Sequence, residues 1–303
     1  MRGVLIAGCG YLGQAAADLF RSEGWNVKGW TSSSRSAQEL SAKPYPVDAV
    51  DISNAEQIGS YTGNFDAVIY CASTRGGDIG VYRRLYLTGT ANLLDQFPGS
   101  KILFTSSTSV YAQKNGDLVT EESAAEPEHE RGEILREAEQ LVLEHGGVVA
   151  RLAGIYGPGR SFLLTRFLKG EALIDPTTDR FVNQIHRDDA ASALLLLLAR
   201  HSLRGRIYNV VDDRPVLQSE YYHWLAEKLE RPLPVVGRPQ FKRKRGDSNK
   251  RVSNAKLRGL GWIPRYPTFV QGIEKSVLPA LRGKELAGQE NFQERSRGDL
   301  SVP

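Results

Sequence analysis

Cysteine is scarce in this chain, whose 303 residues include two, Cys9 and Cys71. Two cysteines are too few for a disulfide framework or a zinc site, so we predict no metal and two buried thiols in a reducing compartment.

Long apolar runs are missing as well. The most apolar stretch, residues 190–199, is about half the ~20 residues of a membrane span. The N-terminus shows no signal-peptide cleavage site, so we expect a cytoplasmic protein with no membrane partner.

Excess charge of either sign is also lacking. The 39 basic and 35 acidic residues leave a net charge of +4, and so small an excess does not indicate a nucleic-acid partner. The basic run at residues 241–245 is interpreted as a solvated loop, and the polar, non-periodic residues 282–303 as a tail. With 41% hydrophobic residues, the rest of the chain has enough apolar side chains for a sizeable core.

Three glycines near the N-terminus are spaced as in a strand-turn-helix unit that binds a dinucleotide. Gly8, Gly10 and Gly13 follow the apolar run 4–7 and precede the helix-like residues 14–20. In such a strand-turn-helix unit one glycine permits the tight turn, one lets the backbone approach a pyrophosphate, and one lets helix and strand pack closely. Free amides at the helix N-terminus then bind the phosphates. The predicted dinucleotide-binding turn comprises Gly8, Gly10, Tyr11, Leu12 and Gly13.

Apolar runs and helical patterns alternate along the first two thirds of the chain. The runs are residues 4–7, 25–30, 47–51, 66–71, 101–105 and 147–152, and the helical patterns include 82–96 and 132–145. Buried strands separated by helices indicate the α/β class, with a Rossmann-type, doubly wound parallel sheet covered on both faces. We predict an NAD(P)-binding Rossmann domain from residues 1–155 and 186–211, and a smaller C-terminal substrate lobe from 156–185 and 212–281.

Six further motifs follow the glycine turn. They are Asp51-Ile52, Cys71-Ala72-Ser73, and the segments 88–94, 105–111, 151–159 and 185–190. In this order they resemble the extended short-chain dehydrogenase/reductase superfamily, and within it the NAD(P)-dependent epimerase/dehydratase-like proteins. The resemblance covers the chain from residue 1 to about residue 280, and the same α/β fold is implied by it.

The resemblance implies a role for several of these residues. Ser107 matches the family's catalytic serine, whose hydroxyl hydrogen-bonds the reacting oxygen of the substrate. Asp51 and Ile52 match the pair that holds the adenine ring, and the segment Cys71-Ala72-Ser73 matches a further cofactor-binding segment. Taken without the resemblance, the residues leave two simpler interpretations open, a turn-stabilising serine and a capping aspartate.

The chain departs from the family at its proton-transfer pair, a tyrosine followed four residues later by a lysine. Alignment through Pro127 and Gly132 places Arg131 at the tyrosine position and Leu135 at the lysine position. An arginine stays charged and cannot replace the tyrosine as a general acid, so the chain resembles an atypical branch of the superfamily. Arg131 is expected instead to bind an anionic group of the substrate.

Three other side chains are candidates at the substrate. Tyr111 follows the serine segment toward the same crevice, and we predict it as the second catalytic residue, an acid. A histidine can supply protons near neutrality, so His186 is a candidate, although a histidine in this motif more often positions the strand-to-helix turn, with Asp188 or Asp189 capping the helix. We predict that His186 and Tyr156 contribute to substrate binding.

The second strand is not followed by an acidic residue, which an NAD-selective site has about twenty residues after the glycine turn. Thr31, Ser32 and Arg35 lie there instead. Hydroxyl donors and a guanidinium suit a 2′-phosphate, so we predict NADP as the cofactor, with NAD as the alternative. The other interpretation of residues 32–36 is a flexible serine loop.

Two functional hypotheses remain from the sequence. The first is an NADP-dependent epimerase/dehydratase-like oxidoreductase that acts on a small polar or sugar-like molecule, nucleotide sugars included, without the usual tyrosine and lysine. The second is a non-catalytic NADP-binding redox sensor or regulatory protein, which the missing pair favours. For either, we expect a monomer or a homodimer.

Overall fold

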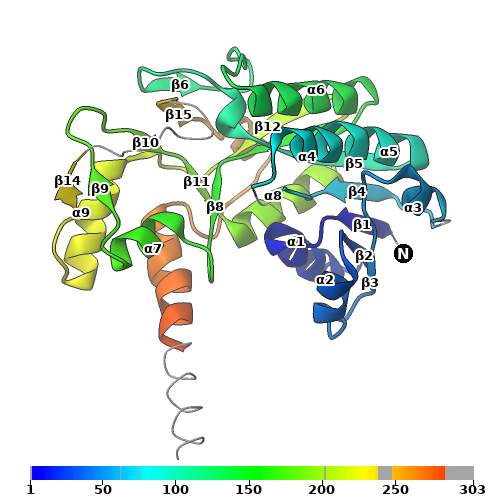
Figure 1. Cartoon of the computed structure of the whole chain (residues 1–303), viewed down its shortest axis with the longest axis horizontal. Coiled ribbons are helices and arrows are strands. Elements are labelled where there is room, and N and C mark those ends of the chain that lie inside the picture. Colours follow the sequence, from blue (N-terminus) through cyan, green and yellow to red (C-terminus); the bar gives the residue numbers. More distant parts are fainter. Residues whose placement is uncertain (1, 62, 75, 201–202, 238–247, 284–303) are drawn as a thin grey trace, which may run out of the picture.

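A seven-stranded parallel sheet forms the centre of the protein (Figure 1). The computed structural model describes residues 2–61, 63–74, 76–200, 203–237 and 248–283, so the predicted basic loop 241–245 and most of the predicted tail lie outside the described residues. The strand order is β12-β7-β5-β4-β1-β2-β3, and all neighbours are parallel. These strands are β1 (Gly3–Ala7), β2 (Asn26–Thr31), β3 (Val47–Ala49), β4 (Ala67–Tyr70), β5 (Lys101–Ser107), β7 (Val148–Leu152) and β12 (Arg206–Val210).

Helices cover both faces of this sheet, as the apolar strands require. One face carries α1 (Tyr11–Ser22) and α8 (Arg187–Ala199), and the other carries α4 (Ile79–Arg83), α5 (Gly89–Gln96) and α6 (Glu130–Glu144) (Figure 1). The remaining helices near the sheet are short, α2 (Ser34–Glu39) and α3 (Ala55–Gly59). The predicted helix 82–96 is α4 and α5 joined by the π-helical turn η1 (Arg84–Thr88). The prediction of a doubly wound α/β fold is confirmed.

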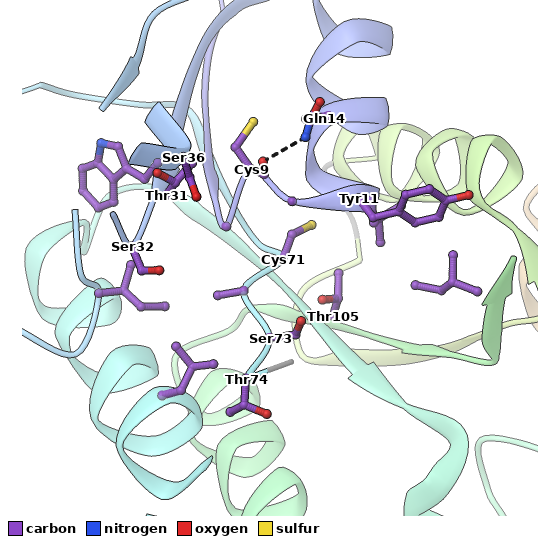
Figure 2. Close-up of a pocket in the computed structure, with 18 of the residues that line it drawn as sticks. Cys9, Tyr11, Gln14, Thr31, Ser32, Ser36, Cys71, Ser73, Thr74 and Thr105 are labelled. Atoms are coloured by element: carbon purple, nitrogen blue, oxygen red, sulfur yellow. Dashed lines mark hydrogen bonds between the residues drawn. The ribbon is translucent and has the colours of Figure 1, made fainter. Parts of the chain in front are cut away.

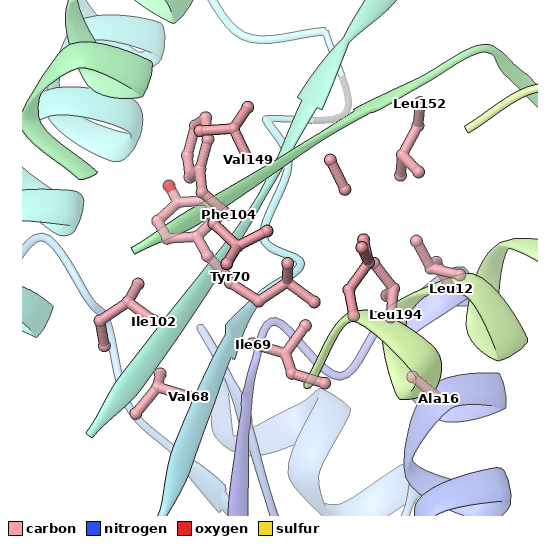
Figure 3. Close-up of a cluster of buried hydrophobic side chains, with 14 of the residues drawn as sticks. Leu12, Ala16, Val68, Ile69, Tyr70, Ile102, Phe104, Val149, Leu152 and Leu194 are labelled. Atoms are coloured by element: carbon pink, nitrogen blue, oxygen red, sulfur yellow. The ribbon is translucent and has the colours of Figure 1, made fainter. Parts of the chain in front are cut away.

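Successive strand residues point to opposite faces and fill two layers of core. In β4, Ile69 packs toward Leu12 and Leu194 of the two helices on one face, while Tyr70 packs with Phe104 on the other (Figure 3). All five of these side chains are buried. Burial on both faces explains why the sequence shows near-continuous apolar runs in place of an alternating pattern.

The C-terminal part of the chain builds a second, smaller core. It is made by α7 (Phe162–Leu168), α9 (Gln218–Leu229), α11 (Phe269–Gly272) and the turn η3 (Ile273–Val277), with Tyr156 packed among them. Outside the seven-stranded sheet, the described residues form four short strand pairs: β8 (Gly154–Tyr156) with β11 (Gln184–His186), β9 (Leu173–Ile174) with β14 (Val235–Val236), β10 (Phe181–Val182) with β13 (Val216–Leu217), and β6 (Asp117–Val119) with β15 (Lys250–Val252). Residues of β15 and α10 (Ala255–Gly259), Val252 and Leu257, pack in the first core.

A buried ion pair joins α6 to the sheet. The Glu139 carboxylate accepts two hydrogen bonds from Arg151 of β7, at 3.0 and 2.7 Å, one from the Ser106 hydroxyl of β5, at 2.6 Å, and one from Arg136. Glu139 and Arg151 are 0% and 1% exposed. Burial alone would lower the pKa of Arg151, but the hydrogen bonds and charge of Glu139 raise it, so the guanidinium stays charged. One carboxylate therefore fixes three elements directly beside Ser107.

In the part of the chain that the structure describes, no helix combines the length and the apolar character needed to cross a membrane.

Removing the Glu139 carboxylate should destabilise the fold. Glu139→Ala leaves the Arg151 guanidinium buried without its partner, and such losses reduce the free energy of unfolding by about 3–5 kcal/mol. The matched control is Glu137→Ala two residues away on the same helix, whose exposed carboxylate lies 3.7 Å from Arg83 and whose loss should cost less than about 1 kcal/mol. Urea denaturation measures both, and equal losses would show that the pair does not hold the fold.

Candidate functional site

A cleft of about 1320 Å³ opens at the carboxyl ends of the sheet strands. It lies where the strand order reverses between β1 and β4, the usual ligand position in an open α/β sheet. Figure 2 shows Thr31, Ser32 and Ser36 at one end of this cleft and Tyr11 at the other, with Cys71 between them. The predicted site residues that line the cleft are Gly8, Gly10, Tyr11, Leu12, Thr31, Ser32, Asp51, Ile52, Cys71, Ala72, Ser73 and Ser107.

Each glycine of the turn meets a different steric requirement. Gly8 has φ +104°, and a Cβ there would lie 2.2 Å from the Ala72 nitrogen. A Cβ on Gly13 would lie 2.2 Å from the Gly8 carbonyl oxygen, so Gly13 lets α1 pack against the turn. A Cβ on Gly10 would meet nothing within 4 Å. Gly10 therefore faces open space, the cradle in which a pyrophosphate would lie.

Free amides face this cradle. The amides of Gly8 and Cys9 donate to the Trp30 carbonyl, at 3.1 and 2.7 Å, and tie the turn to β2. The first bond of α1 runs from the Gln14 amide to the Gly10 carbonyl, at 2.9 Å, which leaves the amides of residues 11–13 without intrahelical partners. Gly10, the N-cap, offers them no side-chain acceptor. This donor set fits a phosphate, because a helix N-terminus favours negative charge.

Hydroxyl groups gather at the end of β2. Thr31, Ser32, Ser33, Ser36 and Glu39 line the cleft there. The Thr31 hydroxyl donates to the Ser33 carbonyl at 3.1 Å, and the Ser33 side chain caps α2. Arg35 was expected among the cofactor-binding residues, but its side chain is 89% exposed, lies outside the cleft lining and pairs with Glu39 at 3.1 Å. The structure therefore places the Arg35 guanidinium on Glu39 and not among the cleft-lining groups at the end of β2.

Asp51 and Ile52 form one wall of the cleft after β3. Asp51 Oδ1 accepts hydrogen bonds from the Ser53 amide and hydroxyl, at 2.9 and 2.8 Å, so this carboxylate also stabilises its own turn. Ile52 is held from α5, where the Asn92 side chain donates to its carbonyl at 3.0 Å. A Cβ on Gly89 would lie 3.0 Å from the Ile52 side chain. The segment 88–94 is thus needed to bring this wall into place.

Both cysteines lie on the cleft, and neither is a ready nucleophile. Burial raises the pKa of Cys9 to about 11 and also raises the pKa of Cys71, so both thiols are protonated near pH 7. A Cβ on Gly29 would lie 3.1 Å from the Cys9 sulfur, which places that sulfur against β2, while Cys71 interacts with Thr105 of β5. Within the described residues, no group of three or more His, Cys, Asp and Glu side chains suits a metal ion.

Ser107 lies at the far end of β5, on the cleft. Its hydroxyl accepts a hydrogen bond from the Ser109 amide at 3.2 Å and caps the 3-10 turn η2 (Thr108–Val110). The two hydroxyls before it are engaged elsewhere, because Thr105 donates to the Tyr70 carbonyl at 2.7 Å and Ser106 donates to Glu139. The Ser107 hydroxyl retains its own proton for donation into the cleft.

Tyr111 does not reach the cleft, contrary to expectation. Its side chain is 0% exposed, its hydroxyl donates to Asn209 at 2.9 Å, and that hydroxyl accepts from Arg151 at 2.8 Å. Burial also raises its pKa. The 3-10 turn after Ser107 redirects the chain and turns Tyr111 into the core. The structure therefore does not bring Tyr111 together with Ser107 at the cleft.

Three residues expected at the substrate, Arg131, Tyr156 and His186, also lie outside the cleft lining. Arg131 donates to the Gly77 carbonyl at 2.7 Å. Tyr156 is 3% exposed and packs in the second core. His186 is 0% exposed, caps α8 by accepting from the Asp188 amide at 3.2 Å, and has its pKa lowered by burial to about 4. The histidine thus positions the strand-to-helix turn, which was the simpler of its two interpretations.

Asp189 has a different task from the expected helix cap. Its two carboxylate oxygens accept from the amides of Arg265 and Tyr266, at 2.6 and 2.9 Å. Leu135 is 2% exposed and packs in the first core. Neither Arg131 nor Leu135 of α6 therefore lines the cleft.

The cleft-lining residues that sequence reasoning missed include Arg84, Tyr86, Arg160 and Phe162. Arg84 and Tyr86 lie in η1, where a π-helical turn changes the helical phase. Arg160 directly follows the turn Gly157-Pro158-Gly159, and Phe162, at 71% exposure, is unusually open for a phenylalanine. The glycine-rich turn was the available signal for the last two.

Comparison with known proteins points to one family. The model of the NAD dependent epimerase/dehydratase family matches residues 4–210. The chain is 27% identical to the protein YeeZ of Escherichia coli over 282 residues. The aligned region covers 88% of this chain and 97% of YeeZ. No function is stated in that name.

Solved structures show the same architecture. A candidate NAD-dependent epimerase/dehydratase from Methylobacillus flagellatus is 28% identical, with a TM-score of 0.76 over 93% of this chain and 99% of that one. A short-chain dehydrogenase/reductase superfamily protein from Agrobacterium tumefaciens with bound NAD has a TM-score of 0.79 over 95% of this chain and 100% of that one. At 18% identity, the second likeness shows the fold alone.

Two glycine substitutions should separate ligand binding from folding. Gly10→Val places its side chain in open space, so we expect the melting temperature to be unchanged while NADPH binding is abolished. Gly13→Val forces a side chain against the Gly8 carbonyl and should destabilise the fold by about 1–3 kcal/mol, the usual cost of overpacking. Thermal melts and titration with NADPH check both. Tight NADPH binding by Gly10→Val would contradict the placement of the pyrophosphate.

Proposed function

We propose, from the premise that the chain belongs to the NAD dependent epimerase/dehydratase family, that it is an NADP-dependent oxidoreductase acting on a small polar or sugar-like substrate. The observation that carries the proposal is that the glycine turn and Ser107 line the same cleft. The family supports binding of a nicotinamide dinucleotide. The choice of NADP, the substrate class and the roles below are our inference.

The residues present fit such a cofactor along the whole cleft. The amides of residues 11–13 would hold the pyrophosphate over Gly10, and Asp51 with Ile52 would hold the adenine. When bound, the nicotinamide supplies or accepts a hydride. The segment Cys71-Ala72-Ser73 lies between the two ends of the cleft and would contact the middle of the dinucleotide.

Selectivity for NADP is inferred from the end of β2. A 2′-phosphate would meet the hydroxyls of Ser32, Ser33 and Ser36, with no carboxylate immediately after the strand to accept a free ribose hydroxyl. Glu39 also lines the cleft, but Arg35 pairs with it and offsets its charge. Arg35 is therefore proposed to favour NADP through Glu39 and not by direct contact.

Ser107 is proposed as the residue that orients the substrate. Its hydroxyl would donate to the reacting oxygen of the substrate and stabilise negative charge that develops there. The rest of the proton path would use water that enters the open cleft, because α6 offers neither a tyrosine nor a lysine. We therefore expect slow turnover compared with relatives that have the full pair, since a positioned acid typically contributes ~100- to 10,000-fold.

The second hypothesis, a non-catalytic NADP-binding sensor, is favoured by one observation. Arg131 donates to the Gly77 carbonyl and Leu135 is buried in the core. These two residues of α6 therefore do not supply the proton transfer for which relatives use a tyrosine and a lysine. An enzyme would turn over at least one carbonyl or nucleotide-sugar compound in an NADPH-linked screen. A sensor would bind NADPH and turn over none. For either function we propose a cytoplasmic monomer or homodimer, in keeping with two free thiols.

Ser107→Ala tests the enzyme hypothesis. Loss of a hydrogen bond to the developing oxyanion should lower kcat by ~100-fold or more on any substrate the screen identifies, while the Kd for NADPH stays nearly unchanged. Ser109→Ala is the matched control, since Ser109 lies two residues away outside the cleft lining. Equal kcat values for the parent and Ser107→Ala would refute the assignment.

Cofactor choice is tested by a charge at the end of β2. The parent should bind NADPH several-fold more tightly than NADH, and Ser32→Asp should reverse this preference because a carboxylate repels the 2′-phosphate and accepts from a ribose hydroxyl. Arg35→Ala should narrow the gap by a smaller factor, because Glu39 then faces the cleft without its partner. Titration of each variant with both nucleotides measures the ratio of the two Kd values. Equal affinities in the parent would contradict selectivity for NADP.

A further inference from the structure

A tight turn brings an arginine into the cleft beside the glycine turn. Gly157 and Arg160 exchange two backbone hydrogen bonds, at 2.9 and 3.0 Å. Between them Gly159 has φ +76°, a conformation that other residues rarely adopt. The turn therefore has a defined shape, and the Arg160 side chain leaves it toward the cleft that it lines.

Arg160 is close to the start of α1 and its charge is not neutralised there. Its guanidinium carbon lies 5.4 Å from the centroid of the Tyr11 ring, and Tyr11 is the first residue of α1. The Tyr11 hydroxyl donates to the Pro158 carbonyl at 3.1 Å, which ties the two turns together. Among the residues that the structure describes, no carboxylate forms an ion pair with Arg160.

A second arginine provides a comparison at the same ring. The Arg187 guanidinium carbon lies 5.1 Å from the Tyr11 ring centroid. Its Nε donates to Asp188 at 2.9 Å, and Arg187 does not line the cleft. The two guanidiniums thus share one aromatic neighbour, and they differ in charge balance and in access to the cleft.

We propose that Arg160 binds the cofactor pyrophosphate from the side opposite the α1 amides. This rests on the dinucleotide site proposed above. The pyrophosphate over Gly10 would lie beside Tyr11, and a guanidinium is well suited to phosphate oxygens because its donors form a planar fork. Arg160 is the cleft-lining cation that the chain places against the first residue of α1.

This contact would also connect the cofactor to the smaller core. Arg160 is followed at once by Ser161 and α7, and Leu164 and Phe167 of α7 are buried in that core. A cofactor held by both Arg160 and α1 therefore restrains the segment 157–168. Phe162, exposed on the cleft, lies in this segment, so cofactor binding would set its position before a substrate arrives.

The experiment compares Arg160→Ala and Arg187→Ala with the parent by calorimetric titration. The ligands are NADPH, 2′-phospho-ADP-ribose, which retains the pyrophosphate, and adenosine 2′-monophosphate, which lacks it. Arg160→Ala should weaken the first two by ~10-fold or more, as expected for a lost charge-assisted hydrogen bond. It should leave adenosine 2′-monophosphate unchanged, and Arg187→Ala should bind all three like the parent. The affinity of the parent for NADPH should also fall more steeply with salt than that of Arg160→Ala.

Several results would overturn the proposal. Parent-like affinity of Arg160→Ala for NADPH and 2′-phospho-ADP-ribose would show that Arg160 does not contact the pyrophosphate, and a simultaneous rise of KM for an anionic substrate would assign the guanidinium to that substrate. An equal loss in Arg187→Ala would assign the effect to packing of Tyr11. If the parent binds NADPH without turnover, the enzyme hypothesis fails while Arg160 is still tested. If the parent binds no NADPH, both fail.

Discussion

The Ser107 end of the cleft depends on the buried carboxylate of Glu139. It holds α6 to Arg151 of β7 and to Ser106 of β5, and Ser107 is the next residue of that strand. Arg151 continues the network to the Tyr111 hydroxyl, which is bonded to Asn209 of β12. The direction of Ser107 is therefore set by charged hydrogen bonds from behind the sheet. The α6 helix thus supports the Ser107 end of the cleft through Glu139, while Arg131 and Leu135 of the same helix lie outside the cleft lining.

The cofactor end depends on backbone geometry. Gly8 brings the turn against Ala72, Gly13 brings α1 against Gly8, and Gly10 leaves the space between them open. Because the amides at the start of α1 have no partners within the helix, this space is suited to an anion. Arg160 approaches the same place from the turn before α7. The two ends together form one cleft that is suited to a dinucleotide.

Much of this could be predicted from the sequence, because regular elements relate residue spacing directly to side-chain direction. The apolar runs predicted the parallel strands and placed Ser107 at the end of β5, and the glycine spacing predicted the turn between β1 and α1. The structure differs from the predictions where the direction of a side chain depends on a turn or on tertiary contacts. The 3-10 turn after Ser107 sends Tyr111 into the core, and Tyr156 is enclosed by helices from distant parts of the chain. His186 accepts the Asp188 amide as a helix cap. The glycine-rich turn before Arg160 was a signal for that residue, but its contact with Tyr11 is made only by folding.

The most direct test of the account is a crystal structure of the protein with NADPH bound. The account predicts pyrophosphate oxygens within hydrogen-bond distance of the Tyr11 and Leu12 amides, over Gly10, with the nicotinamide ring beside the Ser107 hydroxyl. A pyrophosphate bound away from the start of α1, or a nicotinamide ring out of reach of Ser107, would contradict it.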